Sequence, residues 1–93
     1  MEIYTMVYIS LYGGQLWSET NVYNNIDDLE NGYKENIRDI AENIDDDDER
    51  EQFLENYKST CDGNAHWENW DGTEMYALRL YPHTIEYRDD FWD

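Results

Sequence analysis

The sequence predicts a single α+β domain over residues 1–93, in which two acidic helices pack on one face of an antiparallel sheet of about four strands. Two periodicities support this prediction. Side chains alternate strictly in character over residues 2–12, as in a strand, and apolar residues recur at steps of three and four from residue 26, as in a helix. A hydrophobic content of 40% and an aromatic content of 16% favour a folded core despite the high charge.

The first predicted strand covers residues 2–12 and has two different sides. Its aliphatic side, which we expect to face the core, comprises Ile3, Thr5, Val7, Ile9 and Leu11. Its other side, which either lies under a helix or stands open at an interface, comprises Tyr4, Met6, Tyr8, Ser10 and Tyr12. Gly13-Gly14 predicts a two-residue hairpin, so residues 15–22 should form the return strand.

An amphipathic helix follows this hairpin, and either Asn24 or Asn25 can cap its N-terminus. Its buried stripe is predicted to comprise Ile26, Leu29, Tyr33, Ile37, Ile40 and Ile44. Gly32 lies within this helix, where it costs about 1 kcal/mol relative to alanine.

A second helix should begin near Asp47, because Asp46 and Glu49 resemble a capping pair. Its buried face is predicted to comprise Phe53, Leu54 and Tyr57. Residues 59–72, which contain two Asp-Gly turn signals, are predicted to form a loop.

The C-terminal part of the chain predicts two more strands. Residues 73–81 should form one of them, and its apolar face comprises Tyr76, Leu78 and Leu80. Pro82-His83 predicts a turn, after which residues 84–88 would form the last strand.

The net charge of −17 needs an explanation, because self-repulsion at this level destabilises a compact chain. A merely solvated surface is one explanation, and adaptation to high salt is another. Nine Asn, nine Tyr and seven Ile beside only three Ala weaken the halophilic explanation. The third explanation, which we favour, is a partner that normally holds a polyanion. The chain itself should not bind nucleic acid, because such a surface would be basic.

The acidic residues gather on the back of the first helix and in the block that follows it. Residues 27–55 contain 13 acidic and 3 basic side chains, a net charge of −10. The predicted partner-binding residues are Asp28, Glu35, Asp39, Glu42, Asp45, Asp46, Asp47, Asp48, Glu49 and, from the later loop, Trp67. Lys and Arg side chains that clasp phosphates will also clasp carboxylates. The alternative is that these acids only solvate the back of a helix.

Two tryptophans stand in the polar segment 66–72. Tryptophan is enriched in the energetic centres of interfaces, but it can equally cover a small core. We expect Trp70 to lie in the core and Trp67 to contact the partner.

No catalytic residue, metal ligand or cofactor site is predicted, so we do not expect an enzyme. The Asp-rich segments lack the Gly and Glu positions of an EF-hand loop. Cys61 stands alone and is expected to be a buried free thiol, His66 is expected at the surface, and His83 is expected to be a turn residue. The lone cysteine and the absence of a signal-peptide pattern predict a cytoplasmic location.

This profile resembles the DNA-mimic inhibitors of phages and mobile elements, the anti-restriction and anti-CRISPR proteins. Residues 8–17, which read Tyr-Ile-Ser-Leu-Tyr-Gly-Gly-Gln-Leu-Trp, are similar to the opening of the ArdA anti-restriction family. The resemblance implies a non-catalytic protein that occupies the DNA-binding site of a Cas effector, restriction enzyme or nuclease in the cytoplasm of an infected host cell. It implies no contact with nucleic acid or membrane, and it allows a homodimer.

A second class of protein stays open. Residues 86–92, which read Glu-Tyr-Arg-Asp-Asp-Phe-Trp, resemble the C-terminal strand of the immunity proteins that act against ribonuclease colicins. That resemblance implies an immunity protein or antitoxin that neutralises a basic nuclease toxin.

Overall fold

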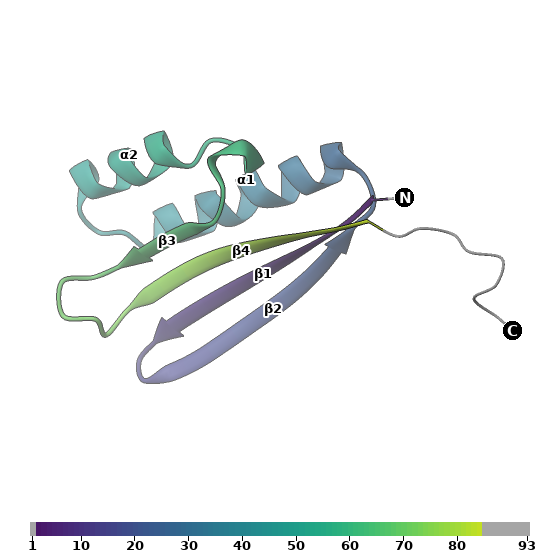
Figure 1. Cartoon of the computed structure of the whole chain (residues 1–93). Helices are drawn as coiled ribbons and strands as arrows, with labels where there is room; N and C mark the ends of the chain where they lie inside the picture. Colours follow the sequence, from purple (N-terminus) through teal and green to yellow (C-terminus); the bar gives the residue numbers. More distant parts are fainter. Residues whose placement is uncertain (1, 85–93) are drawn as a thin grey trace, which may run out of the picture.

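The computed structural model describes residues 2–84, which form a four-stranded antiparallel sheet with two helices on one of its faces (Figure 1). In chain order the elements are β1 (Glu2–Tyr12), β2 (Gln15–Tyr23), α1 (Ile26–Glu42), α2 (Asp47–Asn56), the 3-10 turn η1 (Thr60–Asp62), β3 (Ala65–Glu68) and β4 (Met75–Thr84). The strands lie in the order β2-β1-β4-β3. The predicted α+β class, with an antiparallel sheet and both helices on one face, is therefore confirmed.

Local signals fix the connections that the sequence predicted. Gly13 and Gly14 both adopt positive φ angles, 61° and 78°, and they join β1 to β2 in a tight hairpin. Asn25 caps α1, because its side chain accepts a hydrogen bond from the backbone N–H of Asp28 at 2.8 Å. Asp46 caps α2 in the same way through the N–H of Glu49 at 2.9 Å.

The core lies between the helices and the tyrosine-rich side of β1. It comprises Met6, Tyr8, Tyr33, Ile37, Ile40, Ala41, Ile44, Phe53, Ala65, Tyr76 and Leu78. The expectation that the aliphatic side of β1 faces the core is therefore wrong. Met6 and Tyr8 lie directly opposite Leu80 and Leu78 of β4, so they share the face that packs under the helices. The aliphatic side faces away from the helices.

Two expected helix contacts are also wrong. Ile26 at the start of α1 is 50% exposed and Leu54 in α2 is 40% exposed. Phe53 supplies the buried contact of α2, and the half-buried Tyr57 ring stands 5.0 Å from it, centroid to centroid. The short helix α2 thus attaches to the core mainly through one aromatic pair.

The second half of the chain differs from the predicted arrangement. Segment 59–72 contains η1 and β3 rather than only a loop, and β3 is the fourth strand of the sheet. No turn occurs at Pro82-His83, because β4 continues through both residues to Thr84. The backbone N–H of Leu80 points away from β1 and donates to the side chain of Asn64. Residue 82 has the same orientation as residue 80, so its backbone nitrogen also points away from β1. The lack of an N–H at Pro82 therefore removes no hydrogen bond between β4 and β1. The predicted strand 84–88 lies almost wholly outside the described residues.

Gly32 has a packing role that its helical position did not predict. A Cβ added there would lie 2.8 Å from Cζ of Tyr23. The end of the Tyr23 side chain therefore occupies space on α1 that a side chain at position 32 would fill.

Candidate functional site

All nine acidic residues of the predicted site are exposed. Those on α1 lie on the side of the helix that faces β2. Asp39 and Glu42 share a hollow with Trp17 of β2. Burial, followed by the negative charges of Glu35, Glu19 and Asp28, raises the pKa of Tyr23, also in β2. The acidic back of the helix is thus one wall of a surface that β2 completes.

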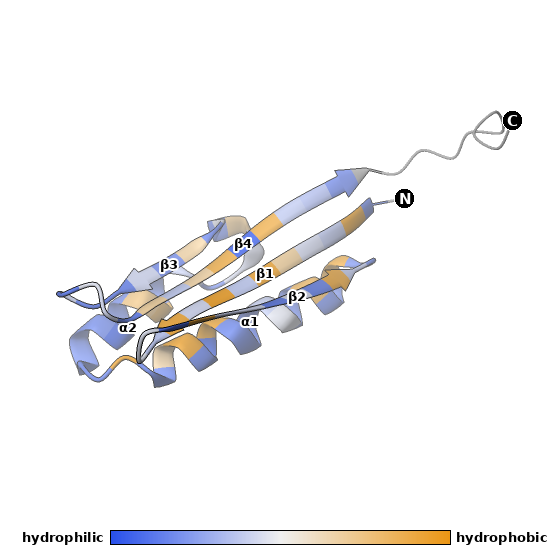
Figure 2. Ribbon diagram, turned by 90° about the horizontal axis from the view of Figure 1, so that it is seen from below, coloured by the Kyte–Doolittle hydropathy of each residue, from blue (hydrophilic) through white to orange (hydrophobic). Residues whose placement is uncertain are grey.

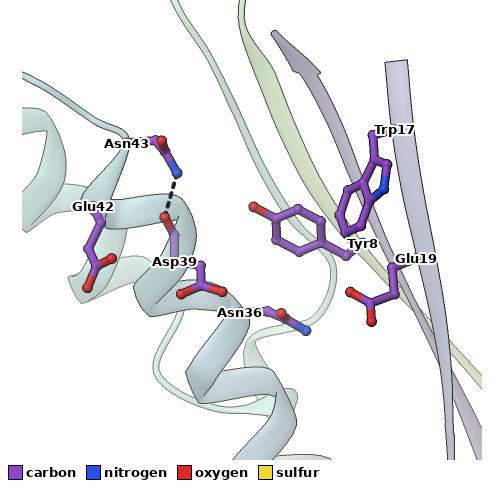
Figure 3. A pocket seen from close by; sticks show the side chains of 7 residues that line it. All are labelled: Tyr8, Trp17, Glu19, Asn36, Asp39, Glu42 and Asn43. Atoms are coloured by element: carbon purple, nitrogen blue, oxygen red, sulfur yellow. Dashed lines mark hydrogen bonds between the residues drawn. The ribbon is translucent and has the colours of Figure 1, made fainter. Parts of the chain in front are cut away.

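The first hollow, between α1 and β2, has a volume of about 240 Å³ (Figure 3). Its lining comprises Tyr8, Trp17, Glu19, Asn36, Asp39, Glu42 and Asn43. The rings of Tyr8 and Trp17 meet edge to face at a centroid distance of 5.8 Å. The hollow therefore combines carboxylates with an aromatic wall.

Tyr8 reaches from the core into this hollow. Its side chain is 8% exposed, and its hydroxyl forms no hydrogen bond with the other six lining residues (Figure 3). Burial raises the pKa of Tyr8 to about 12, and the negative charge of Asp39 contributes in the same direction. Near neutral pH the hydroxyl is therefore protonated and can donate a hydrogen bond to a ligand or accept one from it.

A second hollow, of about 350 Å³, continues from the first, and the two share Asn43. Its lining comprises Asn43, Asp45, Asp46, Glu49, Trp67, Asn69, Trp70 and Glu74. The structure thus brings the acidic block after α1 together with the tryptophan loop between β3 and β4. We call the two hollows together the acidic groove.

The two tryptophans do not lie as expected. Trp70 is 95% exposed, so its assignment to the core is wrong. Trp67 packs against the core and stacks on Tyr76 with ring centroids 6.0 Å apart and planes inclined by 26°. Trp67 still borders the second hollow, so its contact with a partner stays a prediction, and Trp70 is the more exposed ring there.

Four predicted site residues line neither hollow: Asp28, Glu35, Asp47 and Asp48. Asp28 accepts a hydrogen bond from the side chain of Asn25 at 2.7 Å, and Asp47 pairs with Arg50 at 2.9 Å. Conversely, Tyr8, Trp17, Glu19, Asn43 and Glu74 were not predicted as part of the site. The alternation of β2 places Trp17 and Glu19 on one face, which is the signal that could have indicated them.

Among the described residues 2–84, no Lys or Arg lines either hollow. Arg38 and Arg50 are next in sequence to the groove residues Asp39 and Glu49. Arg50 donates to the backbone carbonyl of Ile44 at 2.9 Å and so closes the turn between the helices. Only two ion pairs occur within residues 2–84, Arg50–Asp47 and Lys58–Glu55. The carboxylates of the acidic groove are therefore not neutralised by their neighbours.

Other kinds of site find little support in the described part of the chain. Within residues 2–84, no group of three or more His, Cys, Asp or Glu side chains is placed to hold a metal ion. No helix in the same range is long and apolar enough to cross a membrane. Cys61 is exposed rather than buried, which corrects the expectation from the sequence.

Fold and groove together define a small α+β protein with an acidic surface that is lined by aromatic rings and by no Lys or Arg of residues 2–84. Comparisons with protein-family models, with curated proteins and with solved structures find no match to this chain. Its function is therefore inferred from the chemistry of the groove.

Proposed function

We propose that this protein is a non-catalytic DNA mimic that inhibits a nucleic-acid-binding defence protein, a Cas effector or a restriction enzyme, by occupying its DNA-binding site. The observation that carries the proposal is the composition of the acidic groove. In the part of the chain that the structure describes, seven carboxylates line it and no Lys or Arg does. They belong to Glu19, Asp39, Glu42, Asp45, Asp46, Glu49 and Glu74.

The groove suits the side chains that nucleic-acid-binding proteins present to phosphates. Arginine forms paired hydrogen bonds with carboxylates as it does with phosphates. Exposed indole rings such as Trp17 and Trp70 add cation–π contacts, worth about 0.5–2 kcal/mol each depending on how dry the contact is. A partner site built for a polyanion would therefore gain contacts here that DNA does not offer.

The test begins by capturing the partner from a host lysate and then measures competition with labelled duplex DNA. The informative variant is Asp39→Asn with Glu42→Gln, which removes two charges from the first hollow and preserves side-chain shape. The matched control is Glu51→Gln with Glu55→Gln, which removes two exposed charges of α2 outside both hollows. We expect the groove variant to weaken inhibition at least ~10-fold, about 1.4 kcal/mol, and the control less than ~2-fold.

The salt dependence of association and the competition with DNA distinguish a DNA mimic from an immunity protein. Association with the partner should slow as ionic strength rises from ~0.05 to ~0.3 M, because steering by charge is screened. A partner that binds its DNA at full strength in the presence of the chain would refute the mimic. A captured nuclease toxin whose catalytic site is covered, while its DNA-binding surface stays free, would favour the immunity class instead.

A further inference from the structure

The face of the sheet that points away from the helices is aliphatic and almost free of acid. Ladder pairing places on it the odd-numbered residues of β1 and β4 and the even-numbered residues of β2. Not one of these positions is Asp or Glu, in a chain where 23 of 93 residues are acidic. The nearest carboxylate on this face belongs to Glu68, on the edge strand β3. Carboxylates are thus nearly absent from one face of a strongly acidic protein, and the charged residue on the three long strands of this face is Arg79, which lies opposite Val7.

No described residue packs over this face, which is seen from below in Figure 2. Val7, Ile9 and Leu11 of the central strand β1 are only partly covered by their neighbours. On the flanking strands, Leu16 is 70% exposed and Val22 is 64% exposed. Apolar patches of this kind are unusual on an isolated protein and mark contact surfaces.

We infer that this face binds a second copy of the chain, so that two sheets stack and the helices lie on the outside. A face that carries mostly apolar side chains on its three long strands, with Arg79 as their one charged residue, is suited to pack on a copy of itself across a two-fold axis. Two chains that each carry a charge of −17 can approach closely only where carboxylates are absent. Stacked sheets lie about 10 Å apart, which suits interdigitated aliphatic side chains.

The size of the face approaches that of a stable interface. A strand of 11 residues, as in β1, is roughly 37 Å long at ~3.4 Å per residue. Three strands about 4.8 Å apart are roughly 14 Å wide, which gives a flat area on the order of 500 Å² before side-chain relief is counted. Standard interfaces bury about 800 Å² of accessible surface per partner. The stacked dimer leaves the acidic groove of each copy open on the outside.

The dimer and the proposed mimicry should respond to salt in opposite directions. Repulsion between two acidic chains weakens self-association. The dimer should therefore become tighter as added salt screens that repulsion. Binding of a basic partner depends on attraction and should weaken under the same change. A failure of one proposal is therefore distinguishable from a failure of the other.

The experiment measures the molar mass of the full chain in solution, at concentrations from ~1 to ~100 μM and at low and high salt. Wild type should shift from 11.3 kDa toward twice that value as concentration or salt rises. Val22→Glu and, separately, Leu16→Glu place a charge on the open face at positions that are already exposed. Gln15→Glu, the control, adds the same charge to the opposite side of the same strand.

We expect each open-face variant to weaken self-association at least ~10-fold and Gln15→Glu less than ~2-fold, with thermal unfolding of all three unchanged. Asp39→Asn with Glu42→Gln should leave the dimer intact. A chain that stays monomeric at the highest concentration and salt would overturn the inference. A dimer that survives both open-face charges, or that Gln15→Glu disrupts equally, would overturn it as well.

Discussion

Replacing Trp70 by alanine tests whether the second hollow contacts a partner. The ring is 95% exposed, so its removal takes almost no buried area from the free protein. We therefore expect the free energy of unfolding to change by less than ~0.5 kcal/mol. Covering an indole buries up to ~200 Å², which at ~25 cal/mol per Å² sets an upper limit of about 5 kcal/mol. Ordering of the ring and of the partner side chains on binding offsets part of this free energy. We therefore expect Trp70→Ala to weaken the binding free energy by about 2 kcal/mol, which is roughly 30-fold in affinity.

Trp67→Ala, in the adjoining strand β3, is the comparison variant. This ring stacks on Tyr76 and packs against the core, so the substitution removes buried contacts. We expect it to lower the free energy of unfolding by about 2–4 kcal/mol, toward the lower end of the range for buried aromatic residues because the ring is only partly buried. The two variants should therefore differ most clearly in stability.

Urea denaturation followed by circular dichroism gives the stability of both variants, and titration against the captured partner gives their affinities. Stability must be measured by a signal other than tryptophan fluorescence, because each variant removes a fluorophore. A destabilisation of more than ~1 kcal/mol by Trp70→Ala would mean that this ring packs on the protein. Unchanged affinity in that variant would place the contact elsewhere.

Three further predictions concern the packing of β2, the buried tyrosines and the first hollow. Gly32→Ala should destabilise the protein by about 1–3 kcal/mol in urea denaturation, because the added Cβ meets Tyr23; combined with Tyr23→Leu it should stabilise by up to ~1 kcal/mol. Burial raises the pKa of Tyr8 and Tyr33 from 10.0 to about 12, so their stabilisation should be complete below pH 10 and lost as the pH rises through 12, as followed by tyrosinate absorbance and circular dichroism. Tyr8→Phe should weaken partner binding by about 1 kcal/mol at unchanged stability, whereas Tyr33→Phe should reduce stability by a similar amount and leave binding unchanged, because its hydroxyl donates to the carbonyl of Gly63 at 3.1 Å.

The parts of the fold that the sequence predicted correctly are those set by neighbours in the chain. The stripe from Leu29 to Ile44 follows from the helical repeat, and the caps Asn25 and Asp46 follow from side chains that reach backbone groups three residues ahead. The turn at Gly13-Gly14 follows from their tolerance of positive φ. Each of these signals acts over a few residues, so no knowledge of tertiary packing was needed.

The later strands were harder to predict because tertiary pairing overrides their local signals. β3 has only four residues, too few to show a clear alternation, and it forms where it can pair with β4. Pro82 usually indicates a break, but it is tolerated where its side of the strand has no partner. Both differences arise from the position of each segment within the sheet.

The groove was only half predictable for a related reason. The acids of α1 form a ridge on any helical wheel, and the structure keeps them exposed. Their neighbours Trp17 and Glu19, however, come from β2, which pairing with β1 places beside the helix. Sequence spacing therefore predicts the acidic residues that α1 contributes to the groove, but it does not predict which strand forms the opposite wall.

The orientation of β1 decides what the remaining surface can do. Both sides of this strand are apolar enough to be buried, so composition alone could not choose between them. The choice follows from register, because Tyr8 lies opposite Leu78, and the apolar face of β4 was recognisable in the sequence. Tyrosine also suits the edge of a small core, since its ring fills the space under α1 while its hydroxyl reaches the groove. Burying the tyrosine side therefore supplies the groove with a polar group, and it turns the aliphatic side of β1 away from the helices, to the face where we propose that a second chain binds.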